Sequence, residues 1–235
     1  MISIKKLNKK FDKLEVLKNL DLEISRGGIH AILGPNGSGK TTLIKCILGM
    51  VIPNSGTIEY KGKSIINKWD YRKDILYLPQ IANFPPNLTV KEIIDIVKNV
   101  RGTQAEEQEL IETLGLQSFM KKKLSHLSGG TKQKVNIVLT FMFDGDLIIL
   151  DEPTSGLDPV SLIKLKQIIQ QQKDKGKTIF VTSHIMSFVE EIADNVVFLL
   201  DGNIHFKGTI SQLKDTTGTD SLEHSIAQLL IQENA

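Results

Sequence analysis

The sequence predicts an α/β fold whose core is a mostly parallel sheet flanked by helices. In the second half of the chain, apolar strand-like runs alternate with helical patterns, an order typical of parallel strands joined by helices. The first sixty residues instead contain short strand-like segments with a period of two. Residues 87–143 have helical spacing, so we expect a helical insertion between two strands of the sheet.

The first half of the chain is expected to form strands and one helix. Ile2–Ile4 and Leu20–Ile24 alternate apolar and polar residues, as half-buried strands do. The apolar strand Ile29–Leu33 leads into a glycine-rich loop, after which we expect a helix from Lys40 to about Met50. Further strands are expected at residues 57–60 and 75–79.

The second half is expected to begin with helices. Thr89 and Glu92 have the spacing of a capping box, which predicts a helix start at this point. In Asp158-Pro159, a capping residue precedes a proline, which favours the first turn of a helix. The other expected elements are strands at 147–150, 178–181, 195–200 and 204–207, helices at 131–143 and 186–193, and a final helix capped by Asp220 with Glu223.

Composition excludes several classes of protein. Hydrophobic residues make up 40% of the 235, enough to bury a core, so a disordered chain is excluded. The 29 basic residues nearly balance the 27 acidic ones, so no strong basic field indicates a nucleic acid as the main ligand. Cys46 is the single cysteine, which excludes a disulfide framework and a cysteine-based zinc site.

The expected location is the cytoplasm. The N-terminal residues lack the apolar region of a secretory signal, and no stretch has the ~20 apolar residues of a membrane helix. A single cysteine suits a reducing compartment. We therefore expect any membrane role to be peripheral, at the cytoplasmic face, and to depend on a partner.

Residues 34–41, Gly-Pro-Asn-Gly-Ser-Gly-Lys-Thr, match the phosphate-binding P-loop pattern between a strand and a helix. The glycines let backbone N–H groups turn towards a phosphate, and the helix N-terminus adds partial positive charge. Lys40 is expected to contact the β- and γ-phosphates, and the Thr41 hydroxyl to contact Mg²⁺. An empty glycine-rich turn is the alternative, and the flanking strand and helix argue against it.

Asp151 and Glu152 follow the apolar strand at 147–150. Two adjacent carboxylates at the end of a buried strand are costly unless they serve a ligand, and the carboxyl edge of a parallel sheet faces the ligand crevice. We expect Asp151 to interact with Mg²⁺ and Glu152 to polarise a water molecule. The alternative is an acidic loop with no ligand.

Residues 127–133, Leu-Ser-Gly-Gly-Thr-Lys-Gln, resemble the LSGGQ signature of ABC-transporter ATPases. Other segments resemble further motifs of this family, in the family's order: Phe11 as the adenine-stacking aromatic, Gln80 as the Q-loop glutamine, residues 155–158 as the D-loop and His184 as the switch histidine. Three positions depart from the usual pattern: Phe11 replaces Tyr, Thr131 replaces Gln and Gly156 replaces Ala. The phosphate-facing Ser128 and its two glycines are kept.

This resemblance implies a P-loop NTPase fold with an N-terminal antiparallel β subdomain, an inserted helical subdomain, and ATP hydrolysis with Mg²⁺. It implies that the catalytic residues are Glu152, His184 and Gln80, and that the metal ligands are Thr41, Gln80 and Asp151. The implied nucleotide-binding residues are Phe11, Gly34, Pro35, Asn36, Gly37, Ser38, Gly39, Lys40, Thr41, Thr42, Ser128, Gly129, Gly130 and Asp158.

The resemblance also implies an assembly. Ser128–Gly130 precede a helix and form a second anion-binding N-terminus, which in this family closes over the ATP of another ATPase domain packed head to tail. We expect a single ATPase domain at 1–235, comprising a nucleotide-binding core at 1–86 and 144–210, a helical subdomain at 87–143 and a C-terminal helical tail at 211–235. A homodimer, or a heterodimer with a paralogue, would act on a separate transmembrane permease.

The short tail resembles that of ATPases of ABC-2-type exporters, and residues 78–90 are similar to the ATPase of the exporter used in maturing nitrous-oxide reductase. Export is therefore expected. One alternative is a soluble ABC ATPase acting on a ribosome or DNA, but the chain has one P-loop and no sustained heptads. Another is a small-molecule kinase, in which the signature and the D-loop would have no role.

Overall fold

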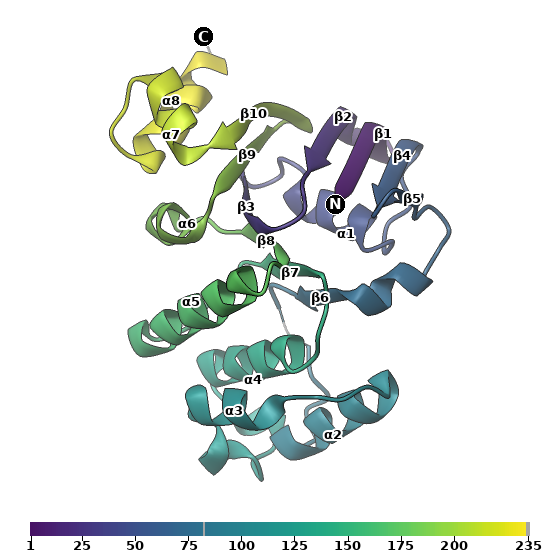
Figure 1. Ribbon diagram of the computed structural model, residues 1–235, viewed down its shortest axis with the longest axis vertical. Helices are drawn as coiled ribbons and strands as arrows, with labels where there is room; N and C mark the ends of the chain where they lie inside the picture. Colours follow the sequence, from purple (N-terminus) through teal and green to yellow (C-terminus); the bar gives the residue numbers. More distant parts are fainter. Residues whose placement is uncertain (82, 234–235) are drawn as a thin grey trace.

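Two sheets form the body of the protein (Figure 1). The computed structural model describes residues 1–81 and 83–233. The smaller sheet is antiparallel with the order β2-β1-β4-β5, and the larger has the order β10-β9-β3-β8-β7-β6. The strands are β1 (Ile2–Phe11), β2 (Leu14–Ile24), β3 (Gly28–Leu33), β4 (Ser55–Tyr60), β5 (Lys63–Ser64), β6 (Ile75–Leu78), β7 (Leu147–Asp151), β8 (Thr178–Thr182), β9 (Asn195–Leu200) and β10 (Asn203–Thr209).

The predicted α/β fold with a mostly parallel sheet is confirmed. In the larger sheet β9, β3, β8, β7 and β6 run parallel, and only the edge strand β10 is antiparallel to its neighbour. The helices are α1 (Lys40–Ile47), α2 (Val90–Arg101), α3 (Glu107–Thr113), α4 (Gly129–Phe141), α5 (Pro159–Asp174), α6 (Met186–Ile192), α7 (Ile210–Thr217) and α8 (Leu222–Glu233). Short 3₁₀ helices lie at Asp70–Asp74, Gln117–Phe119 and Leu124–His126.

The larger sheet is buried on both faces, because alternate residues of each strand enter two different hydrophobic clusters. Ile32, Ile149 and Phe180 pack with α1 and the smaller sheet. Ala31 and Leu150 pack on the other side, among residues of α4, α5 and α6. This explains why the parallel strands read as continuous apolar runs in the sequence.

The helical insertion lies between β6 and β7 in the sequence, and its helices α2, α3 and α4 form the lower part of the view in Figure 1. The predicted capping box is present: the Glu92 N–H donates to Thr89 Oγ1 at 3.2 Å, and the Thr89 N–H donates to Glu92 Oε2 at 2.7 Å. The helix expected at Asp158-Pro159 begins at Pro159, with Asp158 as its N-cap.

Several element boundaries differ from the sequence-based expectations, and three of them have a clear local cause. Helix α4 begins at Gly129 rather than at residue 131, because Ser128 caps it and the two glycines adopt helical backbone. Helix α1 ends at Ile47 rather than near Met50, because Gly49 turns the chain with φ +63°. The cap of α8 predicted at Asp220 is wrong, since the His224 N–H donates to Ser221 Oγ at 3.2 Å.

Candidate functional site

The carboxyl edge of the larger sheet gathers the phosphate loop, the carboxylate pair and His184. Strand β8 lies between β3 and β7, with Thr182 level with Ile32 on one side and with Asp151 on the other. The phosphate loop starts at Gly34, two residues beyond Ile32, and His184 lies two residues beyond Thr182. The strands β3, β7 and β8, from three parts of the sequence, therefore end at one edge of the sheet. Proteins with open parallel sheets bind their ligands at this edge.

The phosphate loop is fitted tightly against neighbouring backbone. A Cβ atom on Gly34, which has φ +149°, would lie 2.0 Å from the carbonyl oxygen of Leu199. A Cβ on Gly39, at φ +107°, would lie 2.8 Å from the carbonyl oxygen of Val16. Only glycine fits either position without moving the backbone. These two glycines fix the path of the loop between β3 and the N-terminus of α1.

The polar side chains of the loop are incompletely paired. Lys40 Nζ donates to the carbonyl oxygens of Gly34 at 2.8 Å and Pro35 at 2.9 Å, which leaves one of its three N–H donors. Burial lowers the pKa of Lys40, and the negative charges of Glu152 and Asp151 oppose that shift. Ser38 Oγ is buried with no hydrogen-bond partner in the described structure. The loop thus presents donors for an anion.

The carboxylate pair is buried and hydrogen-bonded. Asp151 Oδ1 accepts a bond of 2.6 Å from the hydroxyl of Thr182. The Glu152 N–H donates to Thr182 Oγ1 at 3.0 Å and to the Thr182 carbonyl oxygen at 3.2 Å. Glu152 Oε2 lies 2.8 Å from His184 Nδ1, and the exposed fraction of the His184 side chain is 74%. Glu152 and His184 therefore form one unit that opens to solvent.

Gln80 lies at the same sheet edge. Leu78 of β6 is paired with Leu150 of β7, so Gln80 and Glu152, each two residues further on, follow neighbouring strands at the same level. Gln80 is exposed, so its side chain is accessible to a ligand at this edge of the sheet. The arrangement brings the predicted glutamine and the carboxylate pair to adjacent loops.

Phe11 lies at the end of β1, where it pairs with Leu14 across the hairpin. It is 46% exposed, and Lys9 Nζ stands 4.8 Å from the centre of its ring. The same hairpin reaches the phosphate loop, because Leu17 Cδ2 would lie 2.9 Å from a Cβ on Gly39. A partly exposed aromatic ring on this hairpin suits stacking on a flat base.

The signature segment lies at the N-terminus of α4. Ser128 Oγ accepts a hydrogen bond from the Thr131 N–H at 3.3 Å and lies 2.9 Å from Thr131 Oγ1. Ser128 and Gly129 are exposed, and a Cβ on Gly129 would meet nothing within 4 Å. A Cβ on Gly130 would lie 2.4 Å from the carbonyl oxygen of Gly156, so this glycine allows the D-loop to approach. The outer surface of the segment remains open.

Asp158 has a structural role in the described chain. Its carboxylate accepts bonds from the Ser161 N–H at 2.8 Å and the Ser161 hydroxyl at 2.7 Å, and pairs with Lys134 of α4 at 2.9 Å. The hydrogen bonds from Ser161, together with Lys134, hold the pKa of Asp158 well below its usual range. The residue therefore caps α5 and links it to the signature helix.

The sequence analysis missed several buried polar side chains. On α4, Gln133 Nε2 donates to the Pro153 carbonyl at 3.0 Å, and Asn136 Nδ2 donates to the Pro79 carbonyl at 3.1 Å. These bonds tie the signature helix to the loops that carry Glu152 and Gln80. Gln133 and Asn136 could have been found as polar residues on the apolar face of a helix. Thr182 was also missed, and it could have been found as a polar residue at the end of an apolar strand.

The donor set fits a magnesium triphosphate. The unpaired Ser38 hydroxyl and the cradle around Gly34 suit a phosphate group. The Thr41 hydroxyl, the Gln80 amide and the Asp151 carboxylate supply hard oxygen atoms, which Mg²⁺ prefers. Within residues 1–81 and 83–233, no group of three or more His, Cys, Asp or Glu side chains could hold a metal alone.

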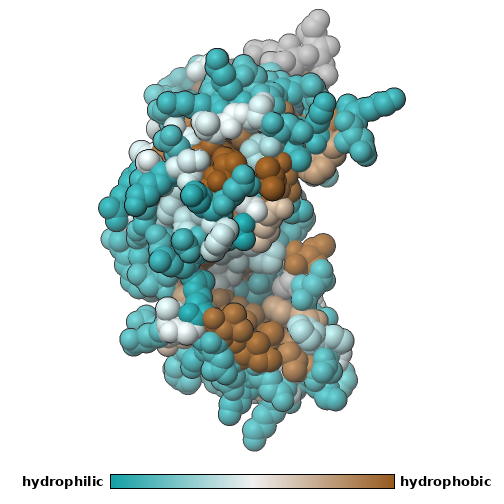
Figure 2. Space-filling model, turned by 90° about the vertical axis from the view of Figure 1, so that its right-hand side faces the viewer, coloured by the Kyte–Doolittle hydropathy of each residue, from teal (hydrophilic) through white to brown (hydrophobic). Residues whose placement is uncertain are grey.

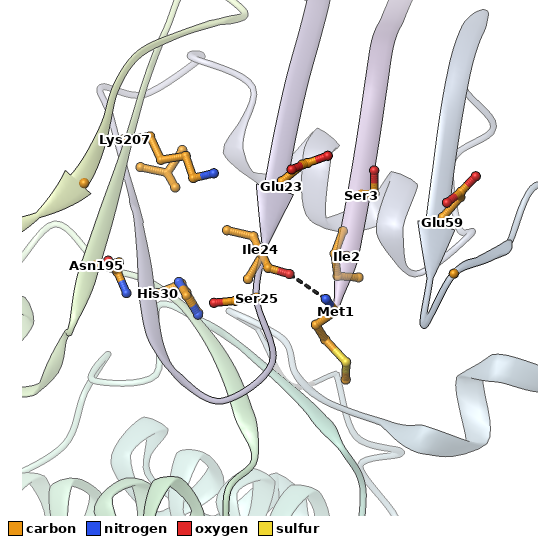
Figure 3. Close-up of a pocket in the computed structure, with 13 residues that line it drawn as sticks. Met1, Ile2, Ser3, Glu23, Ile24, Ser25, His30, Glu59, Asn195 and Lys207 are labelled. Atoms are coloured by element: carbon orange, nitrogen blue, oxygen red, sulfur yellow. Dashed lines mark hydrogen bonds between the residues drawn. The ribbon is translucent and has the colours of Figure 1, made fainter.

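A cavity of about 490 Å³ lies away from this site, between the smaller sheet and the start of β3 (Figure 3). His30, Glu59 and Lys207 are among its lining residues, and the Met1 ammonium beside it donates to the Ile24 carbonyl at 2.7 Å. His30 Nε2 lies 3.1 Å from the carbonyl oxygen of Gly27, and burial lowers the pKa of its imidazole. None of the predicted site residues lines this cavity.

Comparison with protein families and curated proteins identifies similar chains. The family model for the ABC transporter matches residues 17–155. The lantibiotic transport ATP-binding protein SrtF of Streptococcus pyogenes is 34% identical over 227 residues, which cover 95% of this chain and 94% of that protein. The L-cystine import ATP-binding protein TcyC of Bacillus subtilis is also 34% identical, covering 91% of this chain and 92% of that protein.

Solved structures agree with these relatives. A structure of an ATP-binding subunit of an ABC transporter superposes with a TM-score of 0.90 at 30% identity, covering 98% of this chain and 99% of that one. The dimeric ATP-binding cassette MJ0796, in a post-hydrolysis state with ADP and Pi, gives a TM-score of 0.80 at 26% identity, covering 89% and 99%. In the part of the chain that the structure describes, no helix has the length and apolar character to cross a membrane.

Proposed function

The chain belongs to the ABC transporter ATP-binding proteins, and we propose that two such chains close head to tail over two ATP molecules to drive a substrate through a separate transmembrane subunit. ATP binding and hydrolysis are the activity of this family, and the P-loop and carboxylate pair of this chain fit it. The observation that carries the proposal is the 2.8 Å contact between Glu152 Oε2 and His184 Nδ1 at the sheet edge.

Glu152 is the residue proposed to act on the attacking water. Its carboxylate lies beside His184 at the edge where the phosphate loop begins, so it is placed to accept the proton that the water loses. His184 fixes the orientation of this carboxylate and, being largely exposed, can turn towards the terminal phosphate. Such a base contributes ~10²–10⁴ in rate.

The phosphate loop is proposed to bind the triphosphate. Backbone N–H groups of residues 34–42 surround the phosphates, Lys40 donates to the β- and γ-phosphates, and Phe11 stacks on adenine. Thr41, Gln80 and Asp151 would hold Mg²⁺, which neutralises charge that develops on the phosphates. The Ser38 hydroxyl then gains the partner that it lacks in the described structure.

The signature segment is proposed to bind the ATP of the opposite chain. Figure 1 places α4 and α1 in different halves of the molecule, on the two sides of the larger sheet. Ser128 and Gly129 are exposed at the N-terminus of α4, where backbone N–H groups attract an anion. Two chains related by a twofold axis each place this N-terminus over the other's phosphate loop. The dimeric cassette MJ0796 provides a structural precedent for two such chains in contact.

The transmembrane partner is proposed to dock on the face shown in Figure 2, where an apolar patch borders a hollow. Exposed apolar side chains on the segment from the Q-loop through α2 include Ile81, Ile96 and Val100. The location of the chain is then the cytoplasmic face of the membrane. We propose export as the direction, because residues 78–90 are similar to the ATPase of the exporter used in maturing nitrous-oxide reductase. The similar proteins include ATP-binding proteins for lantibiotic transport, bacitracin transport and L-cystine import. A ribosome- or DNA-acting ATPase is not favoured by these relatives.

Replacing Glu152 by Gln tests the proposal. The amide keeps the shape of the side chain but cannot accept the proton, so we expect ATP hydrolysis to fall at least ~100-fold with ATP affinity little changed. Unhydrolysed ATP should then hold two chains together. Size-exclusion chromatography of the variant with Mg²⁺-ATP should show a dimer peak that is absent without nucleotide.

Two control variants sharpen this test. Glu109→Gln, at an exposed position of α3, should keep its activity and form no stable dimer. Adding Ser128→Arg to Glu152→Gln should restore the monomer while each chain still binds ATP, because the bulky side chain enters the phosphate gap. A Glu152→Gln protein that binds ATP yet stays monomeric at high concentration would refute the head-to-tail closure.

A further inference from the structure

We propose that Thr182 is a positioning residue for ATP hydrolysis: its hydroxyl joins Asp151 to the backbone of Glu152 and sets both carboxylates for reaction. This inference rests on the proposed function, because it assigns Thr182 a part only if Asp151 and Glu152 act on the nucleotide. Thr182 itself reaches no substrate, since it is fully buried at the end of β8.

The hydrogen bonds of Thr182 have a single possible direction. The Glu152 N–H can only donate, so Thr182 Oγ1 accepts that bond, at 3.0 Å. The hydroxyl proton is then free to point at Asp151 Oδ1, 2.6 Å away. One hydroxyl therefore fixes the orientation of the Asp151 carboxylate and the position of the Glu152 backbone at the same time.

Glu152 needs such support because its backbone is unusual. Its φ of +49° lies in the left-handed region, which residues other than Gly, Asn and Asp rarely adopt. Such a conformation persists only where its surroundings over-determine it. Here the Glu152 N–H is bound twice, by the hydroxyl and by the carbonyl oxygen of Thr182. This geometry carries the Glu152 side chain to His184, with Oε2 at 2.8 Å from Nδ1.

The position of β8 makes Thr182 suited to this role. It is level with Ile32 of β3, which leads into the phosphate loop, and with Asp151 of β7. A contact from Thr182 therefore fixes the carboxylates relative to the strand that carries the triphosphate site. Removing the Thr182 hydroxyl would let the Asp151 carboxylate rotate and the Glu152 backbone leave its left-handed conformation, while the sheet stays intact.

The same strand provides a matched control. Thr178, at the opposite end of β8, is also fully buried, and its Oγ1 accepts a hydrogen bond of 2.8 Å from the Gly27 N–H. Thr178→Val and Thr182→Val make the same chemical change in the same strand. They differ in which edge of the sheet loses the hydroxyl.

The experiment compares Thr182→Val, Thr182→Ser and Thr178→Val in full-length protein. We expect Thr182→Val to lower kcat for ATP ~10- to 100-fold, since a small misplacement of a reacting group has effects of this size. The KM for Mg²⁺-ATP should rise by a smaller factor, because Asp151 is one of the proposed Mg²⁺ ligands. Thr182→Ser, which keeps the hydroxyl, should recover kcat to within about threefold of the unsubstituted protein. Thr178→Val should leave kcat unchanged, and thermal unfolding should show a lower Tm in both valine variants, with the larger loss in Thr182→Val, which loses two side-chain hydrogen bonds rather than one.

Equal kcat values for Thr182→Val and Thr178→Val would overturn the inference, as would a Thr182→Ser variant no more active than Thr182→Val. Fluorescent-nucleotide binding supplies a readout besides turnover: Thr182→Val should bind ATP without Mg²⁺ as the unsubstituted protein does, and should gain less affinity when Mg²⁺ is added. Full ATP hydrolysis by Glu152→Gln would instead refute the proposed function, so the two failures are distinguishable.

Discussion

Two glycine-rich segments of the protein lie at helix N-termini, one before α1 and one at the start of α4. They differ in how closely the rest of the chain encloses them. The loop before α1 is enclosed: a Cβ on Gly34 would lie 2.0 Å from a backbone oxygen. At α4 the two glycines differ: a Cβ on Gly130 would lie 2.4 Å from the Gly156 carbonyl oxygen, whereas a Cβ on Gly129, on the outer surface, would meet nothing within 4 Å. The buried Ser38 hydroxyl of the first segment has no hydrogen-bond partner among residues 1–81 and 83–233, whereas the exposed Ser128 hydroxyl of the second caps its own helix.

This difference indicates how each segment works. The loop before α1 is shaped by its own chain and needs only a phosphate to complete its hydrogen bonds. The N-terminus of α4 is stable without a ligand, because its cap is already made, and it presents open backbone N–H groups to whatever approaches. We therefore expect substitutions at α1 to act on a single chain and substitutions at α4 to act on the pair of chains.

The largest effect on ATP binding is expected for Lys40→Ala. The variant removes a full charge and its hydrogen bonds from the triphosphate site, and charge-assisted hydrogen bonds are worth about 1.5–3 kcal/mol each, so the Kd for ATP should rise ~100-fold or more. Isothermal titration calorimetry measures this directly. Lys45→Ala, an exposed position on the same helix, is the control and should bind ATP normally. An unchanged Kd for ATP in Lys40→Ala would show that the Lys40 charge does not bind the phosphates.

A matched pair of glycine substitutions should differ most in the stability of the folded chain. Gly34→Ala combines a left-handed φ with a backbone clash, so we expect a loss of about 3–5 kcal/mol, or a Tm lower by roughly 10 °C. Gly129→Ala should change stability by less than about 0.5 kcal/mol, because its Cβ enters open space. Differential scanning fluorimetry measures both.

The same Gly129→Ala protein should nevertheless hydrolyse ATP about 10-fold more slowly, since the added methyl group lies where the other chain's phosphate is expected. A stable variant with full activity would show that the α4 N-terminus does not face a nucleotide. A Gly129→Ala variant with a lowered Tm would show that atoms of the same chain occupy the space beside Gly129.

The smallest effect is expected for Asp158→Asn, which tests how α4 is anchored to α5. The folded-state pKa of Asp158 is lowered, so its ionised form stabilises the fold above the unfolded pKa of about 3.9, and this contribution is lost as the pH falls towards the folded value. The Tm difference between the parent and Asp158→Asn should be constant from pH 7 to 5 and shrink below about pH 4. Asp95→Asn, exposed on α2, should show no such difference.

Local patterns were sufficient to predict much of this protein. The phosphate loop, the carboxylate pair and the cap of α5 depend on residues close together in the chain, such as Asp158 beside Pro159. The parallel order followed from alternating strands and helices. The errors lay at element ends: Gly129 and Gly130 could either break or begin a helix, and the position of Ser128 as N-cap decided between them.

The sequence by itself indicates which residues are proposed to carry the chemistry, because glycines, a lysine and two acids at this spacing fit a phosphate site. Only the tertiary structure decided how Thr182, 31 residues beyond Asp151, holds the carboxylates, and which glycines are enclosed. The physical reason is that such contacts come from strand order and register, which are set when β8 packs between β3 and β7 and not by the neighbouring residues in the chain.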